Sequence, residues 1–293
     1  MRDTKRRLAL KVLGFQEDPF TRSANPRFLY LSPQHKQVAD GLMELVDSHR
    51  GLAVVEGGYG MGKSSLARHL EASLLSEPES YLTLYVHTAS YKNEFAALVD
   101  ICDAFKLPRR RGATQQWREL EHFLIDQAEA GYNIILILDD AHTMEPDALL
   151  FVHHLYNFDV RRKLAQVILF AQPEISRLFQ RHPETASRVD SWFRLNALSL
   201  EETYELVRFR CTVAGREEPF LTQSATIRLW EETQGNPREI VSLCSIVVDV
   251  LGELNKSVAD EQILAASVER WHETIPPVLR TTAEQPLAPA GQE

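Results

Sequence analysis

The chain has 293 residues, of which 44% are hydrophobic and 25% are charged, which is the composition of an ordinary globular protein. Its formal net charge of −9 excludes a protein coated with basic groups for nucleic acid, although a local basic patch stays possible. The sequence holds no run of 18 apolar residues and only three scattered cysteines, so we expect a reduced, cytoplasmic protein without a membrane span.

Apolar runs of strand length alternate with longer amphipathic segments, which is typical of a parallel sheet covered by helices on both faces. The predicted strands span residues 52–56, 82–87, 134–139, 166–171 and 192–195. The predicted helices around and between them span residues 33–47, 63–75, 92–105, 115–130, 146–157 and 174–180. After residue 197 the pattern is helical to about residue 272.

This change of pattern predicts an α/β domain followed by an all-helical one. We expect an N-terminal extension at 1–32, the sheet domain at 33–196 and the helical domain at 197–277. Residues 278–293 are rich in Pro, Ala, Gly and Gln, which favours a disordered tail.

The first chemical motif follows the first predicted strand, where residues 57–64 read Gly-Gly-Tyr-Gly-Met-Gly-Lys-Ser. This is a complete G-x-x-x-x-G-K-[ST] phosphate loop, in which glycines let main-chain N–H groups turn toward a phosphate at the start of a helix. Lys63 is expected to contact the β and γ phosphates, and the Ser64 hydroxyl to ligate Mg²⁺. The predicted ATP-binding residues of the loop are Gly57, Gly58, Tyr59, Gly60, Met61, Gly62, Lys63, Ser64 and Ser65.

The second motif is the apolar run 134–138 that ends in Asp139 and Asp140. Carboxylates at the carboxyl end of a buried strand lie at the ligand crevice of an open α/β sheet. We therefore expect Asp139 to hold the hydrated Mg²⁺ and Asp140 to orient the attacking water. The second acid of such sites is usually Glu, and Asp140 is one methylene shorter, so the sequence predicts slow hydrolysis.

These motifs and several other segments resemble the ExeA-type branch of the AAA+ ATPases, a branch that is similar to the TnsC and TniB regulators of DNA transposition. Beyond the phosphate loop, the resemblance rests on residues 15–20, 25–32, His35, 139–142, 167–175, 200–203, 214–215 and 233–238. It implies a P-loop NTPase αβα sandwich, with a five-stranded parallel sheet of order 5-1-4-3-2 and a C-terminal helical lid.

The resemblance also implies roles for single polar residues. Gln172 falls at the sensor-1 position and would hydrogen-bond the water or the γ-phosphate. Arg238 resembles the sensor-2 arginine of the lid, and Arg188 lies near the expected arginine finger, with Arg194 as the less favoured candidate. A surface salt bridge is the alternative for Arg188 and Arg238. An arginine finger acting on a neighbouring subunit implies a homo-oligomer.

Aromatic residues before the sheet domain allow two interpretations. Phe20, Phe28 and Tyr30 could line the adenine pocket, because a flat apolar base needs stacking surfaces. Alternatively, they attach the N-terminal segment to the core.

A basic segment lies between the second and third predicted strands. Its DNA-contact candidates are Lys92, Arg109, Arg110, Arg111 and Thr114. The same region of TnsC-like regulators contacts DNA, and clustered arginines would follow the backbone of duplex DNA without reading its sequence. A solvated surface loop is the alternative.

Two functions follow from the resemblance. The first is a TnsC-like regulator that binds ATP, forms a ring or helical filament on duplex DNA and links this target to a transposase. The alternative is an ExeA-like ATPase that assists assembly of a secretion or pilus apparatus. Secretion ATPases of that kind continue into a membrane span and a wall-binding domain, which this sequence does not show, so we expect the DNA role.

Overall fold

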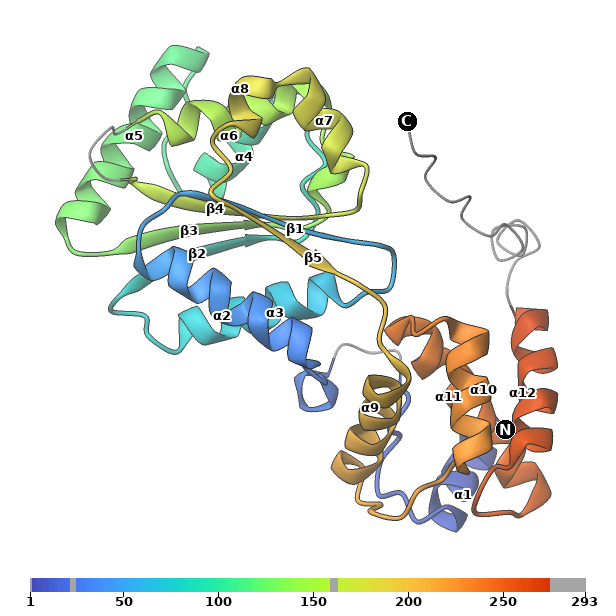
Figure 1. Ribbon diagram of the computed structural model, residues 1–293. Helices are drawn as coiled ribbons and strands as arrows, with labels where there is room; N and C mark the ends of the chain where they lie inside the picture. The colour runs from blue at the N-terminus through green and yellow to red at the C-terminus, as the bar shows by residue number, and fades with distance from the viewer. Residues whose placement is uncertain (1, 22–24, 159–162, 275–293) are drawn as a thin grey trace, which may run out of the picture. The chain divides into compact units, whose positions relative to one another are not determined.

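The computed structural model describes residues 2–21, 25–158 and 163–274, which form two compact units (Figure 1). The sheet unit spans Leu31–Asn196. The helical unit combines Met1–Tyr30 with Ala197–Glu293, as far as these residues are described. The chain therefore passes between the units twice, after Tyr30 and after Asn196. The predicted tail at 278–293 lies outside the described residues.

The sheet unit is built on a five-stranded parallel sheet with the order β2-β3-β4-β1-β5. The strands are β1 (Leu52–Gly57), β2 (Tyr81–Val86), β3 (Asn133–Leu138), β4 (Ala165–Ala171) and β5 (Ser191–Leu195). Each lies within about one residue of its predicted bounds, and the order is the predicted 5-1-4-3-2 counted from the opposite edge. The predicted fold class is therefore confirmed.

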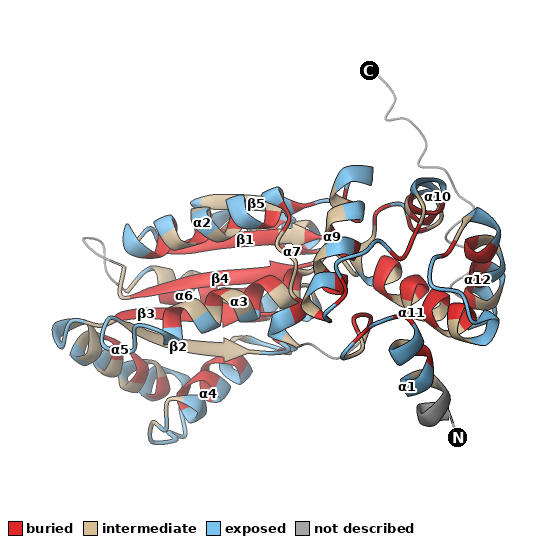
Figure 2. Cartoon of the chain, turned by 90° about the horizontal axis from the view of Figure 1, so that it is seen from below, coloured by how far each residue is buried: buried red, intermediate tan, exposed pale blue. Residues whose placement is uncertain are grey.

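Helices cover both faces of this sheet (Figure 1). The first face carries α2 (Pro33–Asp47) and α3 (Lys63–Leu75). The second carries α4 (Glu94–Ala104), α5 (Ala113–Glu129), α6 (Leu149–Tyr156), α7 (Ile175–Arg181) and the short α8 (Pro183–Ala186). Side chains of β1 alternate between two hydrophobic clusters, since Ala53 and Val55 pack with α2 and α3, whereas Leu52 and Val54 pack with the other helices. Figure 2 shows the resulting buried middle strands.

The helical unit contains α1 (Arg2–Val12), which the sequence did not predict, together with four helices after the sheet. These are α9 (Leu200–Val213), α10 (Gln223–Thr233), α11 (Pro237–Leu254) and α12 (Glu261–Thr274). The N-terminal segment shares their core through Leu13, Phe15, Phe20 and Phe28. A Cβ added to Gly252 would lie 2.2 Å from the Cβ of Ala9, so α1 packs directly on α11. Residues expected to form a separate extension thus belong to the helical unit.

Two buried arginines hold this N-terminal segment through main-chain carbonyls. Arg216 is 8% exposed, and its guanidinium donates to the carbonyls of Leu13 (2.7 Å), Glu218 (2.9 Å), Pro219 (3.0 Å) and Ser257 (2.9 Å). Arg210 donates to the carbonyls of Pro19 (2.7 Å) and Thr21 (3.4 Å). Burial lowers the pKa of both arginines. The carbonyl oxygens around each guanidinium replace part of the water that it loses. The N-terminal segment is therefore built into the helical unit.

The first turn of α2 lies close to both points at which the chain changes from one unit to the other, after Tyr30 and after Asn196. Ser32 caps the helix by accepting the N–H of His35, and it follows the first passage closely in sequence. Gln34 donates to the carbonyl of Arg194 (2.9 Å) and accepts the N–H of Asn196 (3.0 Å), the last residue before the second passage. Across the described ranges, no helix is long and apolar enough to cross a membrane.

Candidate nucleotide-binding site

The phosphate loop connects the end of β1 at Gly57 to the start of α3 at Lys63. Gly60 (φ 83°) and Gly62 (φ 90°) adopt the left-handed conformation that favours glycine. Because all five strands are parallel, the segments that follow β1, β3 and β4 meet at one edge of the sheet, here called the carboxyl edge. The two predicted motifs are therefore brought together.

Lys63 is buried within the loop, with 7% of its surface exposed. Its ammonium donates to the carbonyls of Gly57 (2.8 Å) and Gly58 (2.9 Å). Burial lowers the pKa of Lys63, and the nearby charges of Asp139, Asp140 and Glu174 oppose that shift. The site thus places a cation and several carboxylates at the edge of the sheet, which suits a phosphate group bound together with a divalent cation.

Asp139 is 2% exposed at the end of β3, and both carboxylate oxygens are held. Its Oδ1 accepts the N–H of Asp140 (2.9 Å), and its Oδ2 accepts the hydroxyl of Tyr85 in the neighbouring strand β2 (2.9 Å). Burial, followed by the charge of Asp139, raises the pKa of Tyr85, so its phenol stays a proton donor. A carboxylate retains further lone pairs, and the oxygen donors of Asp139 and Ser64 fit the ligand preference of Mg²⁺.

Asp140 turns the chain sharply after β3. Its backbone is left-handed (φ 52°, ψ 32°), a conformation that aspartate tolerates better than most residues other than glycine. The turn leads into a 3-10 helix, Ala141–Thr143, where Nε2 of His142 lies 2.9 Å from the amide nitrogen of Gln172. The predicted sensor residue therefore contacts the same segment as the predicted catalytic acid.

The two arginine-finger candidates lie at opposite ends of β5. Arg188 precedes this strand, is exposed, and has its guanidinium 5.5 Å from the centre of the Tyr156 ring. Arg194 is paired in register with Glu56 near the carboxyl edge, and its side chain is 71% exposed. Only Arg194 thus shares an edge of the sheet with the phosphate loop. The finger role of both arginines stays a prediction.

The remaining nucleotide candidates belong to the helical unit. Arg238 is exposed in the first turn of α11, where its N–H donates to the Asn236 side chain (3.0 Å). Phe20 (1% exposed) and Phe28 (3% exposed) lie in the helical core, which agrees with the attachment interpretation. Tyr30 is partly exposed, and its ring centre lies 5.8 Å from that of Phe209. Adenine contact by Phe28 and Tyr30, like the sensor role of Arg238, stays a prediction.

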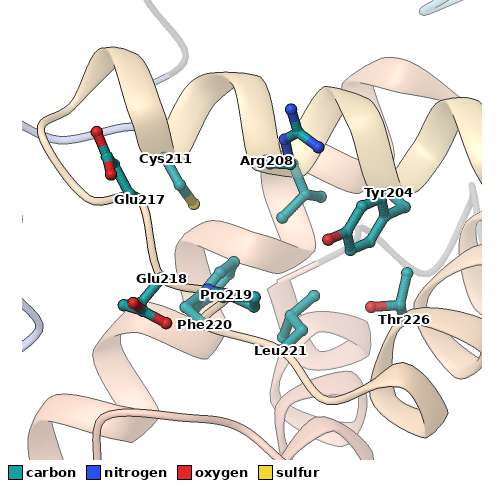
Figure 3. Close-up of a pocket in the computed structure, with 10 residues that line it drawn as sticks. Tyr204, Arg208, Cys211, Glu217, Glu218, Pro219, Phe220, Leu221 and Thr226 are labelled. Atoms are coloured by element: carbon teal, nitrogen blue, oxygen red, sulfur yellow. The ribbon is translucent and has the colours of Figure 1, made fainter.

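A pocket in the helical unit does not offer another nucleotide site. Figure 3 shows side chains of α9, such as Tyr204 and Cys211, facing the segment that contains Phe220 and Leu221. The pocket volume is only ≈ 20 Å³, which is room for about one water molecule. Ligand pockets are usually about 300 Å³ or larger.

The structure separates the DNA-contact candidates. Lys92 precedes α4, whereas the arginines and Thr114 follow it, and a helix of this length spans about 16 Å. Arg110 forms an ion pair with Glu119 (2.8 Å), and its N–H donates to Gln116 (2.6 Å). Arg109, Arg111 and Thr114 are exposed. Arg110 thus has an acidic partner within the chain, and DNA contact by these residues stays a prediction.

Three residues of the site were assigned no role from the sequence. Tyr85 lies within an ordinary apolar strand, and only the pairing of β2 with β3 brings it to Asp139. His142 lies two residues after Asp140, so its position gave a signal, whereas nothing in the sequence indicated its partner Gln172. His35 lies well before the phosphate loop, yet it contacts the main chain of Met61.

The segment that contains this site is similar to known proteins. Residues 46–179 match a protein-family model described as "AAA domain". General secretion pathway protein A of Aeromonas hydrophila is 31% identical over 240 residues, which cover 80% of this chain and 43% of that protein. The chain therefore spans less than half the length of this curated relative.

Solved structures show the same fold at low sequence identity. Cdc6p of Pyrobaculum aerophilum has a TM-score of 0.66 and 16% identity, with 92% of this chain and 74% of that chain covered. The ORC2 protein of Aeropyrum pernix, in ADPNP–ADP complexes, has a TM-score of 0.62 and 16% identity, with 92% and 75% covered. The matched model, the phosphate loop and the sheet order together identify residues 46–179 as an AAA domain of the P-loop ATPase family.

Proposed function

We propose that this chain binds ATP with Mg²⁺ at the phosphate loop and hydrolyses it slowly. The observation that carries the proposal is the convergence of Lys63, Asp139 and Asp140 at the carboxyl edge, where Asp139 is buried and held by Tyr85. Separate sequence motifs meet at this edge of the sheet, which supports a role in phosphoryl transfer.

Each group has a distinct task in the proposed reaction. The N–H groups of the loop and the ammonium of Lys63 bind the β and γ phosphates. Ser64 and Asp139 hold Mg²⁺, which offsets the negative charge that develops on the phosphates. Asp140 orients the attacking water, and Gln172 contacts that water or the γ-phosphate. Tyr85 keeps the Asp139 carboxylate in place.

We further propose that ATP is bound between copies of this chain. Arg188 or Arg194 would supply a guanidinium to the γ-phosphate held by a neighbouring subunit, and Arg238 would contact the nucleotide from the helical unit. Arginine suits these tasks because it stays charged and binds phosphate through two parallel donors. The active form is therefore a homo-oligomer.

For the biological setting, we propose that the ATPase assists assembly of a secretion apparatus. The 31% identity to general secretion pathway protein A supports this setting over a TnsC-like partnership with a transposase. We therefore prefer the secretion setting to the DNA role that the sequence predicted, because the similarity extends over 80% of the chain. Duplex DNA as a partner and a cytoplasmic location stay predictions.

The catalytic part of the proposal is tested at Asp140. Replacing Asp140 with Glu should raise the turnover of Mg²⁺-bound ATP about tenfold, because the longer acid reaches the water better and positioned bases contribute about 100-fold or more. Asp140→Asn, which has the same size but no charge, should lower turnover about 100-fold. Steady-state phosphate release measures both. Equal turnover in the wild type and Asp140→Asn would contradict a role for this acid, and no gain in Asp140→Glu would remove the explanation for slow hydrolysis.

The proposed role in secretion is tested with a chimera of the Aeromonas hydrophila relative. Its segment that matches this chain is replaced by this chain, and secretion is measured in cells that lack the native protein. Secretion should be restored, but not when the chimera carries Lys63→Ala at the same expression level. Electron microscopy with a slowly hydrolysed ATP analogue tests the alternative, because filaments that form only with duplex DNA would favour the DNA role.

A further inference from the structure

His35 is a buried histidine that connects the first turn of α2 to the phosphate loop. It is 5% exposed, and its Nε2 lies 3.0 Å from the carbonyl oxygen of Met61. Its Nδ1 lies 2.8 Å from the hydroxyl of Ser32, which also accepts the His35 N–H (3.4 Å). The imidazole is therefore held between two partners on different segments of the sheet unit.

The chemistry of these partners determines the proton position. A carbonyl oxygen only accepts, so Nε2 of His35 must carry the proton that binds Met61. In the neutral ring Nδ1 is then the acceptor, and Ser32 donates its hydroxyl proton to it. Ser32 thus selects the tautomer that lets His35 donate to the loop.

The Met61 carbonyl belongs to the peptide that enters Gly62. A loop that turns its N–H groups toward a phosphate turns the carbonyls of the same peptides away, and a carbonyl that faces the protein needs a donor. A Cβ added to Gly62 would lie 2.8 Å from Nε2 of His35, so the imidazole packs against this peptide. The contact holds the Met61–Gly62 peptide in one orientation.

We propose that His35 is a positioning residue, which preorganises the phosphate loop for nucleotide by holding the Met61 carbonyl. The inference rests on the proposed ATP site but concerns its affinity and not its chemistry. A loop whose peptides are already oriented loses less conformational entropy on binding. His35 therefore acts on ATP and ADP alike, since the loop binds the β-phosphate of both.

Substitutions of His35 can distinguish the effect of the N–H donor at Nε2 from the effect of the imidazole ring itself. Gln places an amide nitrogen where Nε2 lies, whereas Asn places it at the position of Nδ1. We expect His35→Ala and His35→Asn to weaken binding of fluorescent ADP and ATP analogues about tenfold, which corresponds to about 1.4 kcal/mol. His35→Gln should stay within about threefold of the wild type. The KM for ATP should rise with the dissociation constant, while kcat changes less than about threefold.

Gln34→Ala is the matched control, because it removes two hydrogen bonds of the same helical turn without touching the loop. It should alter nucleotide affinity less than about twofold, and the exposed His122→Gln should leave affinity unchanged. Thermal melting identifies variants that only lose stability.

The outcomes separate this inference from the proposed function. Wild-type affinity in His35→Ala would overturn the positioning role while leaving the ATP site intact. Equal losses in His35→Gln and His35→Ala, or in Gln34→Ala and His35→Ala, would also overturn it, because the donated hydrogen bond would not be the cause. A wild-type protein that binds neither nucleotide would instead contradict the proposed function.

Discussion

Replacing Lys63 with alanine is expected to lower kcat/KM for ATP by about 100-fold or more, which is the largest effect on activity that we predict. Its ammonium lies inside the loop, and removal takes away the cation next to the developing phosphate charge. Preorganised donors of this kind contribute about 100-fold to 1000-fold each. Phosphate release and nucleotide titration together measure the change.

Lys63→Arg should not restore this activity. The buried ammonium donates to two carbonyls at 2.8 and 2.9 Å, whereas a guanidinium is larger and planar. Lys256→Ala, an exposed change of equal charge, is the control and should keep wild-type turnover. Wild-type turnover in a folded Lys63→Ala protein would show that hydrolysis occurs elsewhere.

Replacing Arg216 with methionine is expected to lower the free energy of unfolding of the helical unit by about 3 kcal/mol or more. Carbonyls of Leu13, Glu218, Pro219 and Ser257 would lose their charged donor together. The Leu13 contact is buried, and an unsatisfied buried acceptor costs about 1–3 kcal/mol. The other three contacts are part-buried, so water can partly replace the lost donor there. Because the chain has two units, unfolding is followed by hydrogen exchange of helical-unit peptides and not by one global transition.

Arg208→Met on α9 is the matched control, since this arginine is exposed and should change stability by about 0.5 kcal/mol or less. The partners of Arg216 are neutral carbonyls, so its contribution should persist at high salt. The exposed ion pair between Arg208 and Glu205 should instead weaken, because salt screens charges at the surface. If Arg216→Met exchanges its amides as slowly as the wild type, the carbonyl contacts do not stabilise the helical unit.

Lys63→Ala is expected to cost activity and Arg216→Met to cost stability, because the two residues lie in different units and have different partners. Lys63→Ala should remove activity and leave the sheet unit folded, since the loop glycines and the strands around it stay in place. Arg216→Met should weaken the attachment of the N-terminal segment at Leu13, so protease cleavage between Leu13 and Pro19 should become faster. Cleavage unchanged from the wild type would contradict this account of the N-terminal segment.

The sequence by itself determined the features that depend on local spacing. The phosphate loop needs consecutive glycines before Lys63, and the metal strand needs an apolar run that ends in Asp139, so both could be identified without a partner. Apolar runs of strand length predicted the strands, and in the structure Ser32 and Asn93 cap two of the predicted helices. Strand order came from the resemblance to AAA+ ATPases, and the structure confirms it.

Only the tertiary structure decided which distant residues support these motifs. Tyr85 reaches Asp139 because β2 pairs with β3, and His35 reaches Met61 because α2 lies beside the loop. The N-terminal segment joins the helical unit through apolar packing and through donors from arginines far along the chain, such as Arg216 to the Leu13 carbonyl and Arg210 to the Pro19 carbonyl. Such contacts depend on packing and not on neighbouring residues, so no local pattern carries them. Sequence spacing thus identifies the groups that react, whereas packing decides which residues hold them in position.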